Sequence, residues 1–361
     1  MNGSHIKFFG LDRQYKNLRE HLLDVTDEVL SSGCLMEGPY TTEFENWLCK
    51  VNQSMYAITC HSGTQALEII AQYMVENISN PNHTIYVPTL TYPATANAFI
   101  NAGFNVKLID CDSYGQTDFD TAYDIMSDVN STLIGVGLYG ESLDMPKSPG
   151  QFSLIEDGAQ HWTSDMFNRL GTATTISFDP TKNLSASGNG GAIVTDSQLI
   201  ASWARSYRNN GKHDNNITGT NSRMSELDCA HLLIRKDHLQ YWEVRRKEIA
   251  EYYIEQLEDS DVRIVAKHLA DHSWHKFVID VSNTNISQLE LQTKLREDGI
   301  ETRVHYRRPL HEDPTYSHLD GPGIVGVASS LARNVLSLPI YPELTDSEVE
   351  SVVERVLYHT S

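Results

Sequence analysis

At 361 residues the chain is longer than one hydrophobic core usually supports, so its length predicts two domains. Its 48 acidic and 28 basic residues give a formal net charge of −20, which disfavours a nucleic-acid backbone as a partner. The five cysteines form no C-x-x-C pair and no apolar run reaches membrane length, so we expect a cytoplasmic protein without a metal site, a disulfide framework or a membrane partner.

Strand and helix patterns alternate along the first two thirds of the chain. Apolar residues at helical spacing predict helices over residues 11–31 and 65–74, and a loop rich in glycine and proline is expected over 34–40. Short β-rich runs predict strands at 55–60, 85–88, 106–109, 132–136, 152–157, 174–178 and 192–194. This rhythm is typical of a doubly wound, mostly parallel α/β sheet.

The last third of the chain predicts a second, smaller α+β unit. An amphipathic helix is expected over residues 241–261, with further helices over 287–297 and 345–358. The expected strands are residues 262–265, 276–281 and 301–304. We therefore expect a large domain of residues 10–240 and a small C-terminal domain of residues 241–361.

One lysine follows directly on a predicted strand. The strand over 174–178 is stopped by Pro180, which has no N–H for a ladder, and Lys182 follows in the turn. Glycines then let the chain double back into the strand at 192–194. The sequence therefore predicts that Lys182 is an amine held in place from both sides.

Two further polar features lie at the ends of predicted strands. Asp157 ends the apolar strand over 152–157, and ligands of open α/β sheets bind at the carboxyl ends of strands. The segment Ser62-Gly63-Thr64 precedes a helical run, and a helix N-terminus favours anions. An activated lysine, an acid and a phosphate seat are the three parts of a pyridoxal phosphate (PLP) site, and their order here is typical of one.

Six stretches, distributed over most of the chain, carry a resemblance to a known family. They are Gly38-Pro39 with Phe44-Glu45, Ser62 to Leu67, Val87 to Ala98, Ile155 to Gln160, Ser177 to Asn183, and Asn221 to Leu227. In these stretches the chain resembles the DegT/DnrJ/StrS sugar aminotransferases. That resemblance implies the fold type I architecture of PLP enzymes, with a large seven-stranded sheet domain and a small α+β domain.

The resemblance also implies roles for individual residues. Lys182 matches the lysine that links covalently to PLP, and Asp157 matches the carboxylate that pairs with its pyridine nitrogen. The other implied cofactor contacts are Ser62, Gly63, Thr64 and Ser177 at the phosphate, Tyr92 stacked on the ring, Gln160 beside the ring hydroxyl, and Asn221 reaching the phosphate of a neighbouring subunit. The family's substrate-covering stretch supplies His305, Tyr306 and His311. Packing is the alternative for Tyr92 and for both histidines.

The activity implied by the resemblance is transfer of an amino group, with L-glutamate the expected donor, to a nucleotide-linked 3-keto or 4-keto deoxysugar. The implied assembly is a homodimer with shared active sites. One alternative is the same reaction on a keto-cyclitol or another non-nucleotide ketone. A second is a sugar dehydratase of the same fold, but those enzymes have histidine where Lys182 stands. A third is a PLP-sensing regulator, against which the negative charge and the lack of a DNA-binding domain argue.

The sequence departs from the family pattern at three places. The crossover over residues 141–151 is short and contains two prolines, which leaves almost no room for the usual helix. The sheet face that it would cover is expected to be either solvated or covered by another subunit. His161 and Trp162 replace small residues and either reshape the substrate pocket or pack in the core. Asn189 replaces an acid, and no role is assigned to it.

Overall fold

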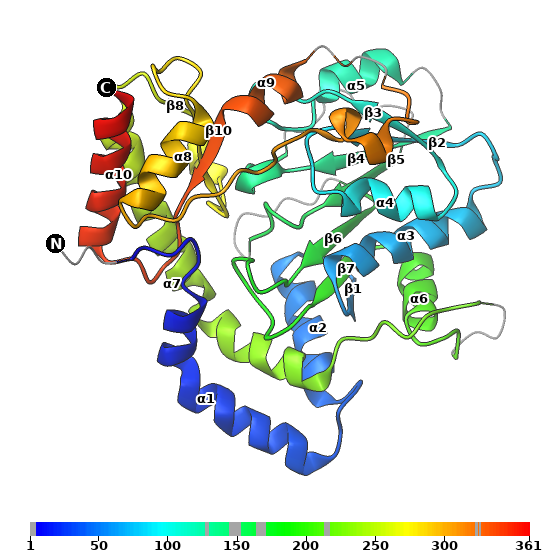
Figure 1. Ribbon diagram of the computed structural model, residues 1–361. Helices are drawn as coiled ribbons and strands as arrows, with labels where there is room; N and C mark the ends of the chain where they lie inside the picture. Colours follow the sequence, from blue (N-terminus) through cyan, green and yellow to red (C-terminus); the bar gives the residue numbers. More distant parts are fainter. Residues whose placement is uncertain are drawn as a thin grey trace.

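A seven-stranded sheet of short apolar strands forms the centre of the protein in this computed structural model (Figure 1). The structure describes residues 5–126, 130–143, 153–163, 171–212, 217–321, 324 and 326–361. The strands are β1 (Tyr56–Cys60), β2 (Thr84–Pro88), β3 (Asn105–Ile109), β4 (Ser131–Val136), β5 (Ser153–Asp157), β6 (Ala173–Ser177) and β7 (Gly191–Thr195).

The strand order is β1-β7-β6-β5-β4-β2-β3. The strand β7 runs antiparallel to both of its neighbours, β1 and β6. The pairs β6-β5, β5-β4, β4-β2 and β2-β3 are all parallel. This arrangement confirms the predicted mostly parallel sheet and places the carboxyl ends of β4, β5 and β6 along one edge.

Successive side chains of the strands enter different cores because they point to opposite faces of the sheet. Ile58 packs in a core with α3 (Gly63–Asn77) and α4 (Ala94–Asn101). Its neighbour Ala57 packs in a second core with α2 (Pro39–Val51). Both faces are therefore covered, and all residues of β4 are buried, as is typical of parallel strands between two helical layers.

The remaining helices complete these layers and the C-terminal unit. They are α1 (Leu11–Ser32), α5 (Phe119–Ile125), α6 (Gln198–Tyr207), α7 (Glu226–Leu257), α8 (Gln288–Glu297), α9 (Val327–Asn334) and α10 (Asp346–Thr360). The C-terminal unit, with α8 and α10, lies to one side of the large sheet in Figure 1. Within the described residues, no helix is long and apolar enough to cross a membrane.

The C-terminal unit contains a small antiparallel sheet of order β10-β9-β8. Its strands are β8 (Arg263–Ile264), β9 (Phe277–Asp280) and β10 (Val335–Leu338). The prediction of a strand over 301–304 is wrong, because only Arg303 in this stretch forms a bridge, with Ser337. The preceding Ile300 forms a bridge with Ile6 of the N-terminal segment. The chain therefore pairs with two different segments in succession and does not extend along one of them as a strand would. The strand β10, which completes the sheet, was not predicted.

The helix α7 joins the two parts of the molecule without interruption. It starts at Glu226, where the Ser225 hydroxyl caps it by accepting from the amide of Asp228, and it continues to Leu257. The sequence predicted a helix over 241–261, and in the structure this stretch is the second half of one longer helix. The expected domain boundary near residue 240 therefore lies inside a helix.

Other local predictions differ from the structure in their extent. The loop expected over 34–40 ends earlier, because α2 begins at Pro39, a residue suited to the first position of a helix. The helices α2, α5 and α9 were not predicted. Most of the short crossover, residues 144–151, lies outside the described residues, as do residues 213–216 of the polar loop before Asn221.

Candidate active site

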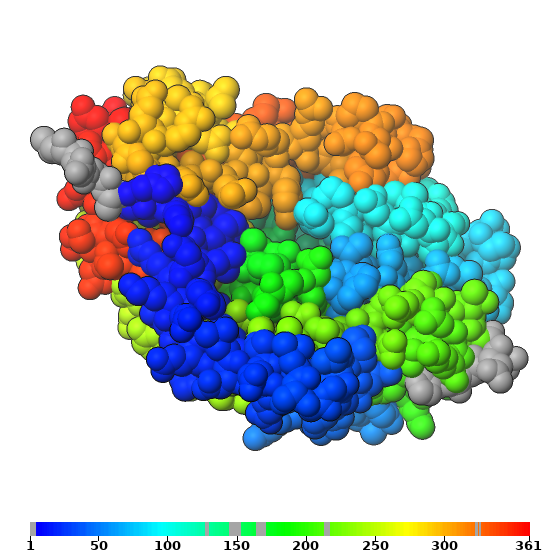
Figure 2. All heavy atoms as spheres, turned by 60° about the horizontal axis from the view of Figure 1, so that its bottom comes forward, coloured from blue at the N-terminus to red at the C-terminus, as the bar shows by residue number. Residues whose placement is uncertain are grey.

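A cavity of about 570 Å³ opens where the carboxyl ends of β5 and β6 face the C-terminal unit. Figure 2 shows that the N-terminal segment, the glycine-rich turn before β7 and the C-terminal segments converge around a hollow on this face. Ten of the predicted site residues line the cavity, namely Ser62, Gly63, Thr64, Tyr92, Asp157, Gln160, Ser177, Lys182, His305 and Tyr306. Sequence reasoning therefore identified residues from five distant segments that the fold brings together.

One end of the cavity is the first turn of α3. Ser62 caps this helix, and its hydroxyl accepts from the amide of Gln65 at 3.1 Å. The amides of Gly63 and Thr64 lie in the first turn, where a helix offers no carbonyl partner. A Cβ at Gly63 would lie 2.7 Å from the Cβ of Ser177, so glycine lets the two segments approach closely. This end of the cavity is suited to a phosphate.

Asp157, the last residue of β5, is a buried carboxylate held in one orientation. Its Oδ2 accepts from the hydroxyl of Thr95 at 2.9 Å, and its Oδ1 accepts from the amide of Ala159 at 3.1 Å. The hydroxyl of Thr95 is in turn 2.9 Å from that of Thr91. Since both oxygens are engaged, the carboxylate presents a fixed edge to the cavity.

Lys182 lies in the cavity on a turn fixed by Asp179. The carboxylate of Asp179 accepts from the amide and the hydroxyl of Thr181, at 2.9 and 2.6 Å, and its carbonyl accepts from the amide of Lys182 at 2.9 Å. Burial lowers the pKa of the Lys182 amine, although Asp157 and Asp179 oppose the shift. A lowered pKa increases the fraction of neutral amine, which is the nucleophilic form.

Gln160 and Tyr306 are joined to Tyr139 in one chain of hydrogen bonds. The side-chain oxygen of Gln160 accepts from the amide of Tyr139 at 3.0 Å, and its Nε2 donates to the hydroxyl of Tyr306 at 2.9 Å. Burial raises the pKa of Tyr306, so its hydroxyl remains protonated at neutral pH. The Tyr92 ring, 57% exposed, lies 6.1 Å from that of Tyr306 on the cavity wall, where a planar ligand could stack.

The two predicted histidines have different surroundings. His305 lines the cavity, and its Nδ1 lies 2.8 Å from the hydroxyl of Ser337. Burial, together with nearby Lys and Arg side chains, lowers the pKa of His305 to about 3, so its imidazole is neutral at physiological pH. His311 does not line the cavity, because its ring is held between Thr89 at 2.8 Å and Ser329 at 3.1 Å.

Asn221 does not line the cavity of its own chain either. It is exposed and bridges Asn209 in a two-stranded contact beside the β1–α3 turn. Its neighbour Ser222 accepts from the amide of His61 at 2.9 Å, one residue before Ser62. The segment is therefore fixed near the phosphate end of the cavity, although Asn221 is not among the residues that line it.

Several cavity residues were not predicted. They are Phe9, Asp179, His275, Lys276 and Arg303, together with the smaller neighbours Leu67, Thr91, Ala94, Val136, Ala159, Thr181, Asn189 and Gly190. A signal for Lys276 exists in the sequence, since a lysine directly precedes the apolar run Phe277-Val278-Ile279 and lysine is rarely buried. Of the family departures, His161 and Trp162 are buried outside the cavity lining, and Trp162 packs in the core with α2.

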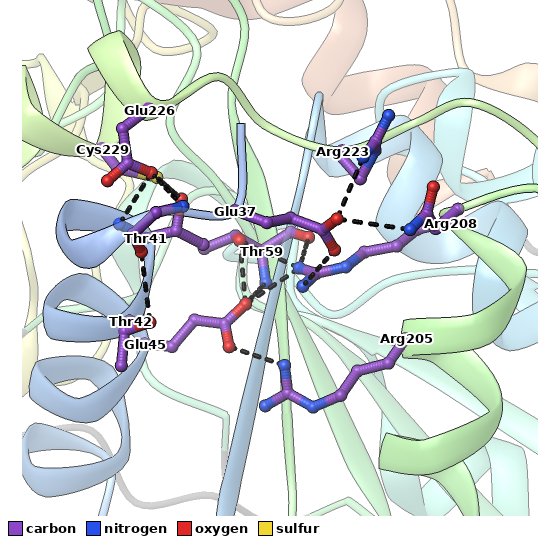
Figure 3. Close-up of polar contacts among 12 residues, drawn as sticks. Glu37, Thr41, Thr42, Glu45, Thr59, Arg205, Arg208, Arg223, Glu226 and Cys229 are labelled. Atoms are coloured by element: carbon purple, nitrogen blue, oxygen red, sulfur yellow. Dashed lines mark hydrogen bonds and ion pairs between the residues drawn. The ribbon is translucent and has the colours of Figure 1, made fainter. Parts of the chain in front are cut away.

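A buried ionic network holds the strand that leads into the phosphate end (Figure 3). Glu45 of α2 binds Arg205 at 2.6 Å and Arg208 at 2.8 Å. The same carboxylate accepts from the amide and the hydroxyl of Thr59, both at 2.9 Å. Arg208 also donates to the carbonyl of Thr59. Because Thr59 lies three residues before Ser62, this network fixes the approach to α3.

The network extends to the loop before α2 and to the start of α7. Glu37 lies 2.9 Å from Arg223 and 3.7 Å from Arg208. Glu226, the first residue of α7, accepts from the amide of Gly38 at 2.9 Å and from the hydroxyl of Thr41 at 2.5 Å (Figure 3). These contacts give α2 an acidic partner at its N-terminus, where a negative charge is stabilising.

The fold and the cavity together define an α/β enzyme whose central lysine lies between a fixed carboxylate and an anion seat. Comparison with family profiles matches residues 16–357 to the DegT/DnrJ/EryC1/StrS aminotransferase family. The chain therefore belongs to this family of sugar aminotransferases.

Known relatives are similar to the chain over nearly its whole length. A Geobacillus stearothermophilus protein named "Pleiotropic regulatory protein" is 30% identical and the match covers 98% of each chain. The dTDP-3-amino-3,4,6-trideoxy-alpha-D-glucose transaminase of Streptomyces venezuelae is 30% identical, and the match covers 97% of this chain and 95% of the relative. The solved structure of NtdA from Bacillus subtilis, with bound cofactor PMP, has a TM-score of 0.88 at 27% identity and covers 99% of this chain and 85% of its own.

The ionic network predicts the effect of Glu45→Gln. The variant removes the carboxylate that binds Arg205 and leaves Arg208 with the more distant Glu37 at 3.7 Å, so we expect it to lose about 3 kcal/mol of unfolding free energy, as measured by urea denaturation. Glu43→Gln, on an exposed position of the same helix, is the control and should change stability by less than about 0.5 kcal/mol.

The difference in unfolding free energy between wild type and Glu45→Gln should depend on pH. Burial favours the neutral form of Glu45, but Arg208 and Arg205 outweigh it and lower the carboxyl pKa below 4.5. A lowered folded-state pKa stabilises the protein at pH values above the unfolded pKa, and the stabilisation is lost as the pH falls through the folded pKa. The gap between wild type and Glu45→Gln should therefore be full at pH 7 and shrink below pH 4.5. A gap that is equal at pH 7 and pH 3 would contradict this role for Glu45.

Proposed function

We propose that the protein is a PLP-dependent aminotransferase that moves an amino group from L-glutamate to a nucleotide-linked 3-keto or 4-keto deoxysugar. The observation that carries the proposal is the common cavity of Lys182 and Asp157, with the first turn of α3 at its end. Membership of the aminotransferase family and the PMP bound in a solved relative support the same cofactor.

The residues of the cavity fit PLP at each of its functional groups. The amides of Gly63 and Thr64 and the hydroxyl of Ser177 would hold the phosphate, Asp157 would face the pyridine nitrogen, and Tyr92 would stack on the ring. The amide of Gln160 would lie beside the ring hydroxyl. When bound, PLP supplies an electron sink that makes the α-carbon of an amino acid acidic.

The protein's own residues then control the proton. Lys182 is the only lysine predicted to bind the cofactor covalently, and once the donor amine displaces it, its Nζ is free to carry the proton away from the donor α-carbon. Because Thr95 and Ala159 hold both of its oxygens, the carboxyl group of Asp157 would stay directed at the ring nitrogen. The neutral imidazole of His305 does not add a competing acid at physiological pH.

The nucleotide-linked substrate is supported by the name of the Streptomyces venezuelae relative, which is a transaminase of a dTDP-linked sugar. A non-nucleotide keto-cyclitol remains the alternative acceptor, and the first test separates the two. A regulatory function, suggested by the name of the Geobacillus relative, would not require the positioned amine of Lys182.

The proposal predicts a half-reaction that can be followed optically. Purified protein loaded with PLP should lose the visible absorbance of the bound cofactor when L-glutamate is added. A keto sugar of the correct class should restore that absorbance. Nucleotide-linked ketones and free keto-cyclitols are tested side by side. Borohydride reduction before glutamate should place the cofactor on Lys182 by peptide mapping. Cofactor on another lysine, or no response to any amino donor, would refute the proposal.

Asp157→Asn should keep the fold but lose most of the rate. The amide is nearly isosteric, yet it carries no charge to hold the ring nitrogen protonated, so we expect a loss of at least ~100-fold in the glutamate half-reaction. The measurement is single-turnover kinetics at saturating PLP. Asp179→Asn is a useful comparison, because it removes a charge from the same cavity at a position that contacts the Lys182 turn. A rate for Asp157→Asn within a few-fold of wild type would exclude the proposed pairing.

A two-fold dimer with shared sites would give Asn221 its role. Its exposed position beside the phosphate end agrees with a contact across subunits, in which Lys182 of one chain and Asn221 of the other complete each site. Lys182→Ala should be inactive and Asn221→Ala should retain PLP poorly. When the two variants are co-expressed, half of the randomly paired dimers are mixed and each has one intact site, so about a quarter of all sites should recover. Activity at limiting PLP equal to the average of the separate variants would show that Asn221 does not act across the interface.

A further inference from the structure

Lys276 is a second amine in the cavity, and nothing in the proposed mechanism uses it. It directly precedes β9, is only 5% exposed, and its side chain lines the same cavity as Lys182. Its backbone is fixed, because its amide donates to the carbonyl of Tyr139 at 2.8 Å. The amine lies 4.8 Å from the ring centre of Phe9 and 5.5 Å from that of Phe8.

Arg303, which lies in a different segment from Lys276, approaches the same two rings. Its guanidinium carbon lies 5.4 Å from the ring centre of Phe9 and 5.6 Å from that of Phe8. It also lines the cavity, but it is exposed, so it stands nearer the mouth than Lys276. Two basic side chains from different segments of the C-terminal unit thus meet over one pair of aromatic rings.

Neither cation has an acidic partner. Throughout the part of the chain that the structure describes, the side chains of Lys276 and Arg303 form no hydrogen bond and no ion pair. Burial lowers the pKa of Lys276 well below its usual value, and the charges of Lys182 and Arg246 lower it further, while Asp179 opposes the shift. The aromatic faces offset a small part of this cost.

A buried amine without a counter-ion gives up its charge, and a ligand of opposite charge in the same cavity would restore it. The missing component is an anion. The first turn of α3 already provides a seat for the cofactor phosphate, and that seat is built from the β1–α3 and β6 segments. Lys276 and Arg303 belong to the C-terminal unit, so they form a separate seat on the other wall of the cavity.

We propose that Lys276 and Arg303 bind the carboxylate of the amino-acid donor. This inference rests on the proposed aminotransferase function. An amino acid carries its α-carboxylate on the same carbon as the amino group that must reach the cofactor beside Lys182. Lys182 is also the charged group that affects the pKa of Lys276 most strongly. The neutral imidazole of His275, which also lines the cavity, adds a hydrogen-bonding group beside this seat.

Binding of a carboxylate should recharge Lys276. An amine whose pKa is held low in the free site becomes protonated when an anion pairs with it, because the opposite charge favours the charged form. Ligand binding is therefore coupled to proton uptake. That coupling distinguishes an anion seat from a lysine that only fills space.

The first test uses glutarate, a dicarboxylate without an amino group, and the PLP-loaded enzyme. Titration calorimetry in two buffers of different ionisation enthalpy measures both affinity and proton uptake. Wild type should bind with uptake of a proton. Lys276→Met should bind at least ~10-fold more weakly and lose the uptake, and Arg303→Gln should bind more weakly but keep it. Lys247→Met, an exposed lysine on α7, is the control and should match wild type.

The second test separates the donor from the keto acceptor. In single-turnover experiments, Lys276→Met should raise the half-saturating concentration of L-glutamate by at least ~10-fold, while the limiting rate changes by only a few-fold. The half-saturating concentration of the keto sugar, measured with the pyridoxamine form, should stay within about 2-fold of wild type. A loss in the limiting rate with a shifted pH profile would instead make Lys276 a proton-transfer group and overturn the carboxylate seat.

A stability measurement guards against a misfolded variant. Replacing an unpaired buried amine by an apolar side chain of similar length should raise the Tm by at least ~2 °C at pH 7. A lowered folded-state pKa destabilises the protein at pH values below it, and the effect fades as the pH rises toward 10.5. The gain in Tm should therefore be larger at pH 6 than at pH 10, whereas a structural role for Lys276 would lower the Tm at both.

The outcomes separate this inference from the proposed function. Wild type that transfers no amino group from any amino acid refutes the function, and the glutarate titration still tests the seat. Unchanged glutarate affinity in Lys276→Met, or no glutarate binding to wild type, overturns the seat while transamination stands. A defect confined to the keto-sugar half-reaction would also overturn it, since the anion would then belong to the acceptor.

Discussion

The active-site cavity depends on one buried tyrosine that holds three segments at once. Tyr139 follows β4 with a left-handed backbone, at a φ of 66°, and each of its polar groups binds a different part of the chain. Its amide donates to Gln160, its carbonyl accepts from the amide of Lys276, and its hydroxyl donates to the carbonyl of His305 at 2.6 Å. The wall that carries the proposed cofactor contacts and the wall built by the C-terminal unit are therefore positioned against each other by a single residue.

The cavity gathers three basic side chains within a strongly acidic molecule. The chain carries a formal net charge of −20, yet Lys182, Lys276 and Arg303 line a space in which Asp157 and Asp179 are the acids. An acidic surface repels anions at long range, so the protein concentrates its attraction for them in one enclosed place where the local dielectric strengthens it. Selection of the proposed anionic ligands would then depend on the interior of the site and not on the surface field.

Local sequence patterns were sufficient for the parts of the site that lie at strand ends. Lys182, Asp157 and Ser62-Gly63-Thr64 could be placed because a proline, an apolar run and a helix start each fix a position within a few residues. Lys276, Arg303 and Phe9 could not, because they become neighbours only when the N-terminal segment packs against the small sheet. The same limit explains the error over 301–304, where the residues read as a strand but bridge two separate segments. The family resemblance added Tyr92 and Gln160, which no local pattern would have selected.

The uninterrupted helix α7 has a mechanical consequence. Its 32 residues, about 48 Å at the usual rise, contain neither glycine nor proline, and their first half packs against α1 and α2 while the second half packs in the C-terminal core. A helix of this kind resists bending, so it is not expected to act as a hinge. The large sheet and the C-terminal unit, which carry the two walls of the cavity, are thus joined by one continuous helix, and a change in the width of the cavity would have to come from segments outside α7.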